Sequence, residues 1–376
     1  MYPRLPRNIS LSAIARTQGR VHWHKASLPR TSRSLKLAPS QRLIGSLRMS
    51  TSSICSQSTT SDASSSRIAN VPPTEPWRCH FEFDDETPTI YTFFEKMTST
   101  WQYVVADMKQ GEAIVIDPVL DYDPASGKVS TATADGLLSF ARSMGLTITG
   151  IMETHAHADH LTAAHYMKEA LGGNVPVGIG ARIDQVQKTF APMYGMDDPN
   201  MFQNTFDTLF HDDEPIRVGS FIGKVIHLPG HTPDHVGYVI GKAVFAGDSI
   251  FNPDVGSARA DFPGGDVHDL YTSMKRLLSL PEDYRLFVGH DYPSGRDQTC
   301  SATVHEQRLR NKHVTIGTAE AEFAQWRKAR DSVLGAPRLL HPSLQVNIRG
   351  GRLPPPDAEG RVWFKTPIVK PVEVKI

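Results

Sequence analysis

The seven residues from Thr154 to His160 constrain this chain more than any other feature of its sequence. They read Thr-His-Ala-His-Ala-Asp-His, which places three imidazoles and one carboxylate close together. The run directly before them, residues 148–152, is apolar and rich in strand-forming residues, so it predicts a buried β-strand. Polar side chains at the mouth of such a strand need partners, because a buried polar group without one costs free energy.

A metal ion is the partner that fits these side chains best. Imidazole and carboxylate groups bind zinc, iron and manganese, and this loop supplies enough of them for one or two ions. A single histidine is more often a hydrogen-bonded or surface residue, but that explanation does not account for so dense a cluster. We therefore predict a metal site in the loop that follows this strand.

Basic residues are concentrated at the N-terminus. The 376-residue chain has 40 basic and 40 acidic side chains, yet residues 1–61 contain ten Lys or Arg and no acid. Such an Arg- and Ser-rich segment is typical of a mitochondrial transit peptide; a disordered basic arm is the alternative. We expect a transit peptide and a Ser/Thr-rich junction over residues 1–70, and a location in the mitochondrial matrix. A start at Met49 would give a cytosolic form.

The remainder of the chain has an acidic balance. It carries 30 basic against 40 acidic residues, a net charge of −10, whereas a nucleic-acid-binding surface needs positive charge. We expect no nucleic-acid partner. No window holds the roughly 18 apolar residues of a membrane span, so we expect no membrane association. Cys55, Cys79 and Cys300 do not suggest a disulfide framework.

Strand-like and helix-like segments alternate after the leader. We predict strands over residues 89–94, 103–107, 113–116, 148–152, 176–179, 223–228, 235–240, 243–245 and 285–288. We predict helices over 134–144 after an N-cap at Thr133, over 161–171, from Asp266 to about 280, and over 320–334 after Thr318. The tail from Arg338, rich in Pro and Gly, is expected to wrap the surface.

This alternation predicts an α/β protein in which two sheets pack together with helices outside. His231, Asp248 and His290 each follow a predicted strand, as His155 does. The sandwich would bring these strand ends to one edge, where catalytic loops commonly lie. We expect a catalytic domain over residues 77–312 and a C-terminal helix and tail over 313–376.

The candidate ligands, taken in chain order, resemble the pattern of the metallo-β-lactamase superfamily. All seven positions of that pattern are filled, by His155, His157, Asp159, His160, His231, Asp248 and His290. The resemblance implies a four-layered αβ/βα sandwich with a metal site at its edge, but it does not imply a particular reaction.

Two glutathione-handling branches of the superfamily are the nearest. The runs at 259–262 (RADF), 289–292 (GHDY) and 306–311 (ExRxxN) look like the persulfide dioxygenase branch, and residues 344–348 resemble its bacterial members. In the other branch, the hydroxyacylglutathione hydrolases or glyoxalase II enzymes, His-Glu-Tyr usually stands at 290–292. His235, however, is a residue that some hydrolases also carry.

The dioxygenase resemblance implies one Fe(II) per chain, held by the catalytic residues His155, His231 and Asp248. Two imidazoles and one carboxylate leave positions for O₂ and for a persulfide sulfur. The implied reaction converts glutathione persulfide, O₂ and water to sulfite and glutathione in mitochondrial sulfide catabolism. The other four residues of the pattern (His157, Asp159, His160 and His290) would then lie outside the ligand set and orient it.

The hydrolase resemblance implies two zinc ions on the same seven residues. His155, His157 and His231 would hold one ion, Asp159, His160 and His290 the other, and Asp248 would bridge them. Hydroxide on zinc would attack a thioester. A non-catalytic binding protein of this fold is a third hypothesis, but such relatives commonly lose ligands, and none is lost here.

Glutathione carries two carboxylates, so its site should present cationic side chains. Arg259 and Arg308 are the candidates in the family-like runs. Tyr292, next to His290, is expected to contact the substrate or a metal-bound oxygen. Each of the three has an alternative role in a salt bridge or in ring packing, and the sequence leaves a homodimer open.

Overall fold

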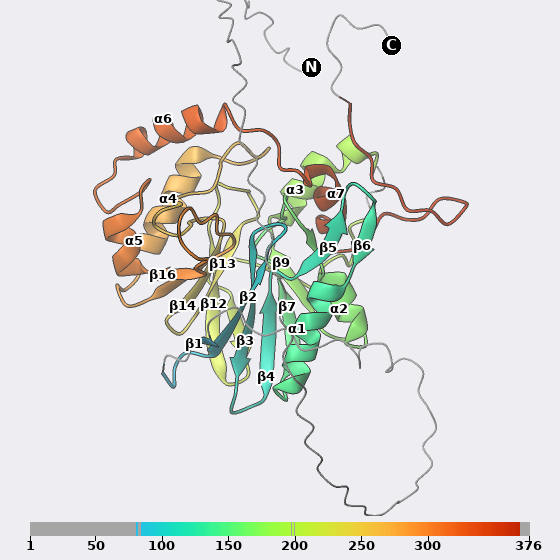
Figure 1. Cartoon of the computed structure of the whole chain (residues 1–376), viewed down its shortest axis with the longest axis horizontal. Helices are drawn as coiled ribbons and strands as arrows, with labels where there is room; N and C mark the ends of the chain where they lie inside the picture. The colour runs from blue at the N-terminus through green and yellow to red at the C-terminus, as the bar shows by residue number, and fades with distance from the viewer. Residues whose placement is uncertain (1–79, 82–83, 197, 199, 369–376) are drawn as a thin grey trace, which may run out of the picture. The chain divides into compact units, whose positions relative to one another are not determined.

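Two β-sheets form the centre of the structure (Figure 1). Among the described residues, the larger sheet has seven strands in the order β1-β2-β3-β4-β7-β9-β10, and the second has six in the order β11 to β16. The computed structural model describes residues 80–81, 84–196, 198 and 200–368. The expected transit peptide and junction over residues 1–70 therefore lie outside the described residues.

The nine predicted strands are present, and the described residues contain seven further short strands that were not predicted. The larger sheet contains β1 (His80–Phe81), β2 (Thr89–Glu95), β3 (Thr100–Asp107), β4 (Glu112–Ile116), β7 (Thr147–Met152), β9 (Val177–Gly180) and β10 (Thr208–Phe210). The second sheet contains β11 (Pro215–Val218), β12 (Phe221–His227), β13 (Val236–Ile240), β14 (Ala243–Gly247), β15 (Arg285–Val288) and β16 (Ser301–Thr303). A small ladder joins β6 (Lys128–Ser130), β5 (Val119–Asp123) and β8 (Leu161–Thr162).

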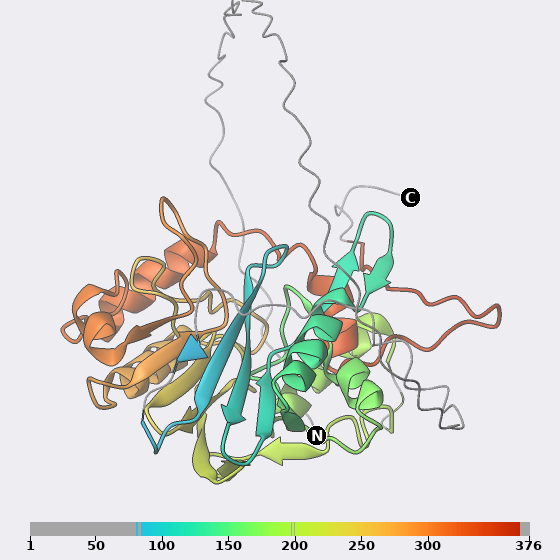
Figure 2. The same ribbon diagram turned by 60° about the horizontal axis from the view of Figure 1, so that its bottom comes forward.

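Helices cover the outer faces of both sheets. The helices are α1 (Ala132–Ser143), α2 (Ala164–Ala170), α3 (Ile183–Phe190), the 3₁₀ turn Pro192–Tyr194, α4 (Val267–Leu278), α5 (Val304–Arg310), α6 (Glu320–Asp331) and α7 (Leu340–Asn347). Figures 1 and 2 show α1 and α2 on the side of the larger sheet and α4, α5 and α6 on the side of the second. The four-layered αβ/βα sandwich is thus confirmed.

Strand β3 shows how the sequence builds these layers. Its residues are all buried and point alternately to opposite faces of the sheet, because side chains on a strand alternate with a period of two. Val104 and Ala106 pack with the apolar face of α1, whereas Tyr103 and Val105 pack between the two sheets. A continuous apolar run is therefore the pattern expected of a strand covered on both sides.

Parallel pairing brings the ligand loops to one edge. Strand β7 lies between β4 and β9 and is parallel to both, and β14 is parallel to β15. The carboxyl ends of these strands therefore point the same way within each sheet. The loops after β7, β14 and β15 carry His155, Asp248 and His290.

Three predicted helix starts differ from the structure. Helix α1 begins at Ala132 after Thr131, because Asp121 binds the backbone N–H and the hydroxyl of Thr133 and leaves it no capping role. The predicted helix over 161–171 begins only at Ala164, since Leu161 pairs with β5. Helix α6 begins after Ala319, because the Thr318 hydroxyl accepts the backbone N–H of Thr315.

The C-terminal segment is only in part the surface tail that its Pro and Gly content suggested, because residues 352–368 are mostly exposed but the residues before them are buried. It contains α7, whose Leu344 and Val346, with the following Ile348, are fully buried. These side chains join the core that packs α1 against the larger sheet. In Figure 1 this helix lies beside α3 and the β5–β6 ladder. Within the described residues, no helix has the length and apolar character needed to cross a membrane.

The packing of α7 predicts that Leu344→Ala lowers the free energy of unfolding by about 2–5 kcal/mol, the usual cost of a cavity in a core. Urea unfolding followed by circular dichroism measures the change. Leu353→Ala is the matched control, because Leu353 is 39% exposed and its truncation leaves no buried cavity. Equal stability of the two variants would show that α7 is dispensable for the core.

Candidate metal centre

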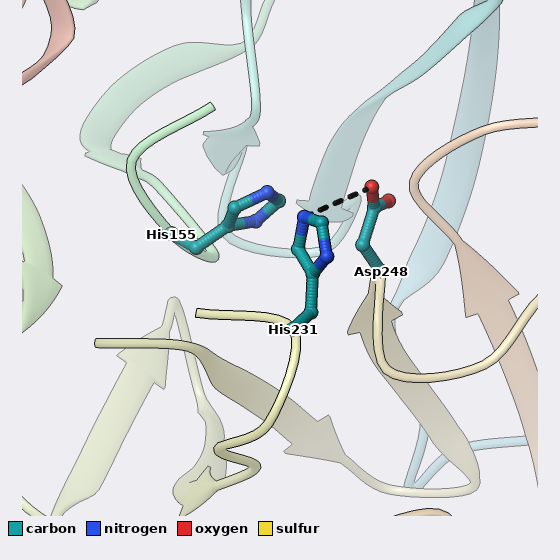
Figure 3. A group of neighbouring side chains, drawn as sticks. All are labelled: His155, His231 and Asp248. Carbon is teal, nitrogen blue, oxygen red and sulfur yellow. Dashed lines mark ion pairs between the residues drawn. The ribbon is translucent and has the colours of Figure 1, made fainter. Parts of the chain in front are cut away.

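His155, His231 and Asp248 converge at the edge of the sandwich (Figure 3). Each offers one ligand atom, and these atoms all lie within 4.8 Å of one another. The Nε2 atom of His231 is 3.7 Å from Oδ2 of Asp248. All three residues are at least nine-tenths buried, so the loops of the two sheets bring together one group of two imidazoles and one carboxylate.

Hydrogen bonds determine which imidazole nitrogen of His155 is free. The Thr154 hydroxyl donates to Oδ2 of Asp117 at 2.9 Å, so its oxygen can only accept from Nδ1 of His155, 3.0 Å away. The remaining nitrogen, Nε2, then carries a lone pair and has no partner among the described atoms. Burial and the neighbouring imidazoles lower the pKa of His155 well below its ordinary value, which keeps the ring neutral as a ligand must be.

The same argument applies to His231. Its Nδ1 lies 2.8 Å from the carbonyl oxygen of Arg259, which can only accept a hydrogen bond. This bond fixes the tautomer and leaves Nε2 with its lone pair facing Asp248. The backbone of the family-like run at residue 259 thus orients a candidate ligand.

His157 is held by two buried carboxylates. Its Nε2 lies 3.1 Å from Asp117 and 3.3 Å from Glu153. Burial opposes a charge on this ring, but the two carboxylates outweigh it and raise the pKa of His157 to about 10. Burial raises the pKa of Glu153 to about 7. The pair orients the ring so that Nδ1 is left without a partner.

His290 lies between two carboxylates. Its Nδ1 is 2.8 Å from Asp248 and its Nε2 is 2.7 Å from Asp159. Burial works against a charged ring, but these carboxylates raise the pKa of His290 well above its ordinary value. Both of its nitrogens are therefore engaged, unlike those of the other candidate ligands.

Three buried imidazole nitrogens are left without any hydrogen-bond partner among the described residues: Nε2 of His155, Nδ1 of His157 and Nε2 of His160. Buried polar atoms in native proteins are satisfied in the large majority of cases. A metal ion that displaces the proton of His157 would satisfy all three nitrogens, so the residues fit a metal. A second group, His157, Asp159 and His160, also places its ligand atoms within 4.8 Å of one another.

The segment Asp234–His235 ties the loop of His155 to that of Asp248. Asp234 accepts the backbone N–H of Ala156 at 2.8 Å. The ring of His235 stacks on that of His155 at 4.7 Å, and its Nε2 accepts the backbone N–H of Asp248 at 2.9 Å. Since Nε2 accepts there and burial lowers the pKa of His235 to about 3, this imidazole supports the site as a neutral group.

Asn347 at the end of α7 closes the ligand loop from the far end of the chain. Its amide nitrogen donates to the carbonyl oxygens of His157 and His160 at 2.7 and 2.8 Å. Its amide oxygen accepts the backbone N–H of Thr162 at 2.9 Å. One buried side chain thus satisfies three backbone groups of the loop and fixes its conformation.

A cavity of about 840 Å³ opens onto the site and is lined by Asp159, His231 and Asp248. Arg259 and Tyr292 also line it. The guanidinium of Arg259, however, is bound to Asp261 at 2.5 and 2.7 Å and to the carbonyl oxygen of Gly335. Tyr292 is half exposed, and its ring stacks on His290 at 6.0 Å.

Arg308 lies elsewhere. Its guanidinium binds Glu282 and the carbonyl oxygens of Leu278 and Leu280, and it does not line the cavity. Substrate binding by Arg259, Tyr292 and Arg308 stays a prediction. For Arg308 the structure provides a structural role at the end of α4.

The residues that support the ligands were missed from the sequence, although signals for two of them exist. Asp117 follows β4, which is parallel to β7, so the strand-end argument applied to the histidines also applies to it. Glu153 directly precedes the Thr154–His160 loop, in a buried position. Asn347 lies in the run 344–348 that resembles bacterial dioxygenases, but nothing local connects residue 347 with the loop at 154–160.

We expect Asn347→Asp to weaken metal binding roughly 10–100-fold, the range found when outer groups of a metal site are changed. The carboxylate keeps the shape and the acceptor for Thr162, but it loses the donors to His157 and His160. Chelator competition followed by elemental analysis measures the affinity. Asn200→Asp, at an exposed position, is the control. Unchanged affinity in the Asn347 variant would refute this positioning role.

The raised pKa of Glu153 gives a pH-dependent prediction for the metal-free protein. The unfolded chain releases this proton near pH 4.5, whereas the folded protein keeps it to about pH 7. Between these values the unfolded state binds fewer protons, so the free energy of unfolding falls as pH rises. Glu153→Gln removes this loss.

Urea titrations in the presence of chelator should therefore show a change in relative stability with pH. From about pH 5 to pH 8, the free energy of unfolding of Glu153→Gln should rise by on the order of 2 kcal/mol relative to that of the wild type. Glu322→Gln, on the exposed side of α6, should show no such trend. A difference between Glu153→Gln and the wild type that does not change with pH would contradict the assignment.

Comparisons with known proteins agree with this geometry. The family model of the metallo-beta-lactamase superfamily matches residues 97–290. The beta-lactamase hydrolase-like protein of Xylella fastidiosa (strain 9a5c) is 44% identical over 75% of this chain, and the match spans 65% of that relative's length. Glyoxylase B2 of Dictyostelium discoideum is 43% identical over 74% of this chain and 96% of its own.

Relatives at lower identity include members of both glutathione-handling branches. Hydroxyacylglutathione hydrolase of a Bradyrhizobium species is 30% identical over 61% of this chain and 80% of its own. The mitochondrial persulfide dioxygenase ETHE1 of Homo sapiens is 29% identical over 60% and 76%. The crystal structure of ETHE1 from Myxococcus xanthus matches 70% of this chain and 99% of that chain, with a TM-score of 0.56 and 26% identity. The fold, the ligand pattern and these matches establish that the chain belongs to the metallo-β-lactamase superfamily.

Proposed function

We propose that this protein is a persulfide dioxygenase that oxidises glutathione persulfide with O₂ and water to sulfite and glutathione at a single non-haem iron. The observation that carries the proposal is the group of His155, His231 and Asp248, which opens onto the cavity through His231 and Asp248. Two imidazoles and one carboxylate are the ligands of non-haem Fe(II) oxygenases. A bound Fe(II) would supply open positions at which O₂ and the persulfide sulfur meet.

The engagement of His290 favours one ion at this group. Both nitrogens of His290 are bound to carboxylates, Asp248 on one side and Asp159 on the other. A second ion held by His290 and Asp159 would have to break the ion pair between these two side chains. With one ion, His290 holds Asp248 in place as a ligand, and Asp159 holds His290.

The remaining residues bind and orient. Thr154 and the Arg259 carbonyl set the tautomers of His155 and His231. Tyr292 stands on His290 at the cavity wall, where its hydroxyl can contact the substrate. The cavity of about 840 Å³ lies within the range of roughly 300–1,000 Å³ that is usual for small-molecule sites.

The comparisons support the proposal in part. Both the human relative and the Myxococcus structure bear the name ETHE1, and the human one is a persulfide dioxygenase. At higher identity stand proteins named as beta-lactamase hydrolase-like and as a glyoxylase.

A dinuclear zinc thioesterase of glyoxalase II type is therefore the second candidate. It is favoured by the group of His157, Asp159 and His160, whose ligand atoms also lie within 4.8 Å of one another. In this hypothesis the free nitrogens of His157 and His160 would belong to zinc ligands.

Anaerobic purification and elemental analysis distinguish the two functions, together with assays of O₂ uptake on glutathione persulfide and of lactoylglutathione hydrolysis. We expect one iron per chain, rapid O₂ uptake and no thioester cleavage. His155→Ala, His231→Ala and Asp248→Ala should each fail to retain iron, since no group replaces the missing ligand. The rate of O₂ uptake should fall at least about 1,000-fold in each variant.

His160→Ala is the informative control. A residue outside the ligand set should keep one iron per chain and cost only roughly 10–100-fold in activity. Two zinc ions in the wild type, one in this variant, and thioester cleavage without O₂ uptake would instead establish the hydrolase.

A further inference from the structure

Three cationic side chains line the cavity without a direct hydrogen bond or ion pair to any described acid. Lys312, Arg330 and Arg338 all line it, and all three are exposed. Among the residues that the structure describes, none of these three side chains has a hydrogen-bond or ion-pair partner. We call Lys312, Arg330 and Arg338 the cationic wall.

The acids of the cavity have partners other than the three cations of the wall, although Lys312, after Arg296, also lowers the pKa of Asp254. Asp159 and Asp248 belong to the metal centre. Asp254 is bound by Arg296 at 2.7 and 2.8 Å. One cavity of about 840 Å³ thus contains both a metal centre rich in carboxylates and a group of unpaired cations.

The wall comes from a different part of the chain than the metal ligands. Lys312 follows α5, Arg330 is in the last turn of α6, and Arg338 stands between α6 and α7. All three lie beyond residues 97–290, which the family model matches. Figure 1 shows the chain leaving α6 and crossing to α7, so this segment spans the two helical sides of the sandwich.

Arg259, which the sequence predicted to bind substrate, differs from the three cations of the wall because its guanidinium already has partners. Its guanidinium fork is taken up by Asp261, and a further N–H by the carbonyl oxygen of Gly335. A free carboxylate entering the cavity would therefore meet the wall rather than Arg259. Lys and Arg side chains without a partner attract and bind carboxylates by charge-assisted hydrogen bonds.

We propose that the cationic wall binds the carboxylates of the thiol that carries the reacting sulfur, and so selects an anionic low-molecular-weight thiol with two carboxylates, such as glutathione. This proposal rests on the proposed function for its reaction, but the binding step can be tested without it. A thiol without carboxylates would gain nothing from the wall.

Binding is measured by isothermal titration calorimetry with S-methylglutathione, whose sulfur cannot carry the persulfide, and with its diethyl ester, in which both carboxylates are masked. Lys312→Gln, Arg330→Gln and Arg338→Gln are tested singly and together. The control variant combines Arg142→Gln, Lys188→Gln and Arg310→Gln. It removes the same number of positive charges from exposed positions outside the cavity.

We expect each single variant to weaken S-methylglutathione binding roughly 3- to 5-fold and the triple variant at least about 20-fold, as for exposed ion pairs that add up. The control should bind as the wild type does. Added salt should weaken binding to the wild type more than to the triple variant, because salt screens exposed charges. The diethyl ester should bind weakly and equally to all variants.

Four results would refute the proposal that the cationic wall binds glutathione. They are unchanged S-methylglutathione affinity in the triple variant, an equal loss of affinity in the control variant, no binding of S-methylglutathione to the wild type, and tighter binding of coenzyme A than of S-methylglutathione. O₂ uptake separates this proposal from the proposed function. Absent uptake with the expected binding pattern refutes the dioxygenase alone, whereas persulfide oxidation with an unchanged KM in the triple variant refutes the wall alone.

Discussion

The burial of unsatisfied imidazole nitrogens is the constraint on which the rest of this structure depends. His155, His157 and His160 are at most 1% exposed, and each keeps one nitrogen that no described atom satisfies. Burial limits the access of water to these nitrogens, and a bound metal ion would return free energy lost on burial. The neighbouring carboxylates supply the negative charge that makes a cation stable there.

Most of the surrounding polar residues serve to aim these nitrogens. Asp117 orients His157 directly and His155 through Thr154, while Asp234 and His235 connect the loops of the two sheets. Asn347 fixes the backbone of the same loop from the C-terminal helix. A ligand set held this way is organised before the ion arrives, which favours tight binding and a defined open side.

Charges of opposite sign lie in different parts of the cavity. Carboxylates surround the metal centre, whereas the unpaired cations come from the segment after α5. The body of the chain is acidic overall, with a net charge of −10 after residue 61. In an acidic protein, a locally positive wall would attract anions to this cavity.

The sequence by itself determined the layers, the strand ends and the ligand group. Alternating apolar runs predicted the strands on either side of β3, and the Thr154–His160 loop predicted the metal site that His231 and Asp248 complete. These inferences succeed because they depend on local periodicity and on residue types that few other roles require. Only the tertiary structure decided that α7 is buried and that Asn347 supports the loop. It also decided that Arg259 and Arg308 are bound, whereas Lys312, Arg330 and Arg338 have no hydrogen-bond or ion-pair partner in the part of the chain that the structure describes. Such assignments depend on which distant segments meet when the two sheets close on each other, and a side chain's partners across that distance leave no pattern in the sequence around it.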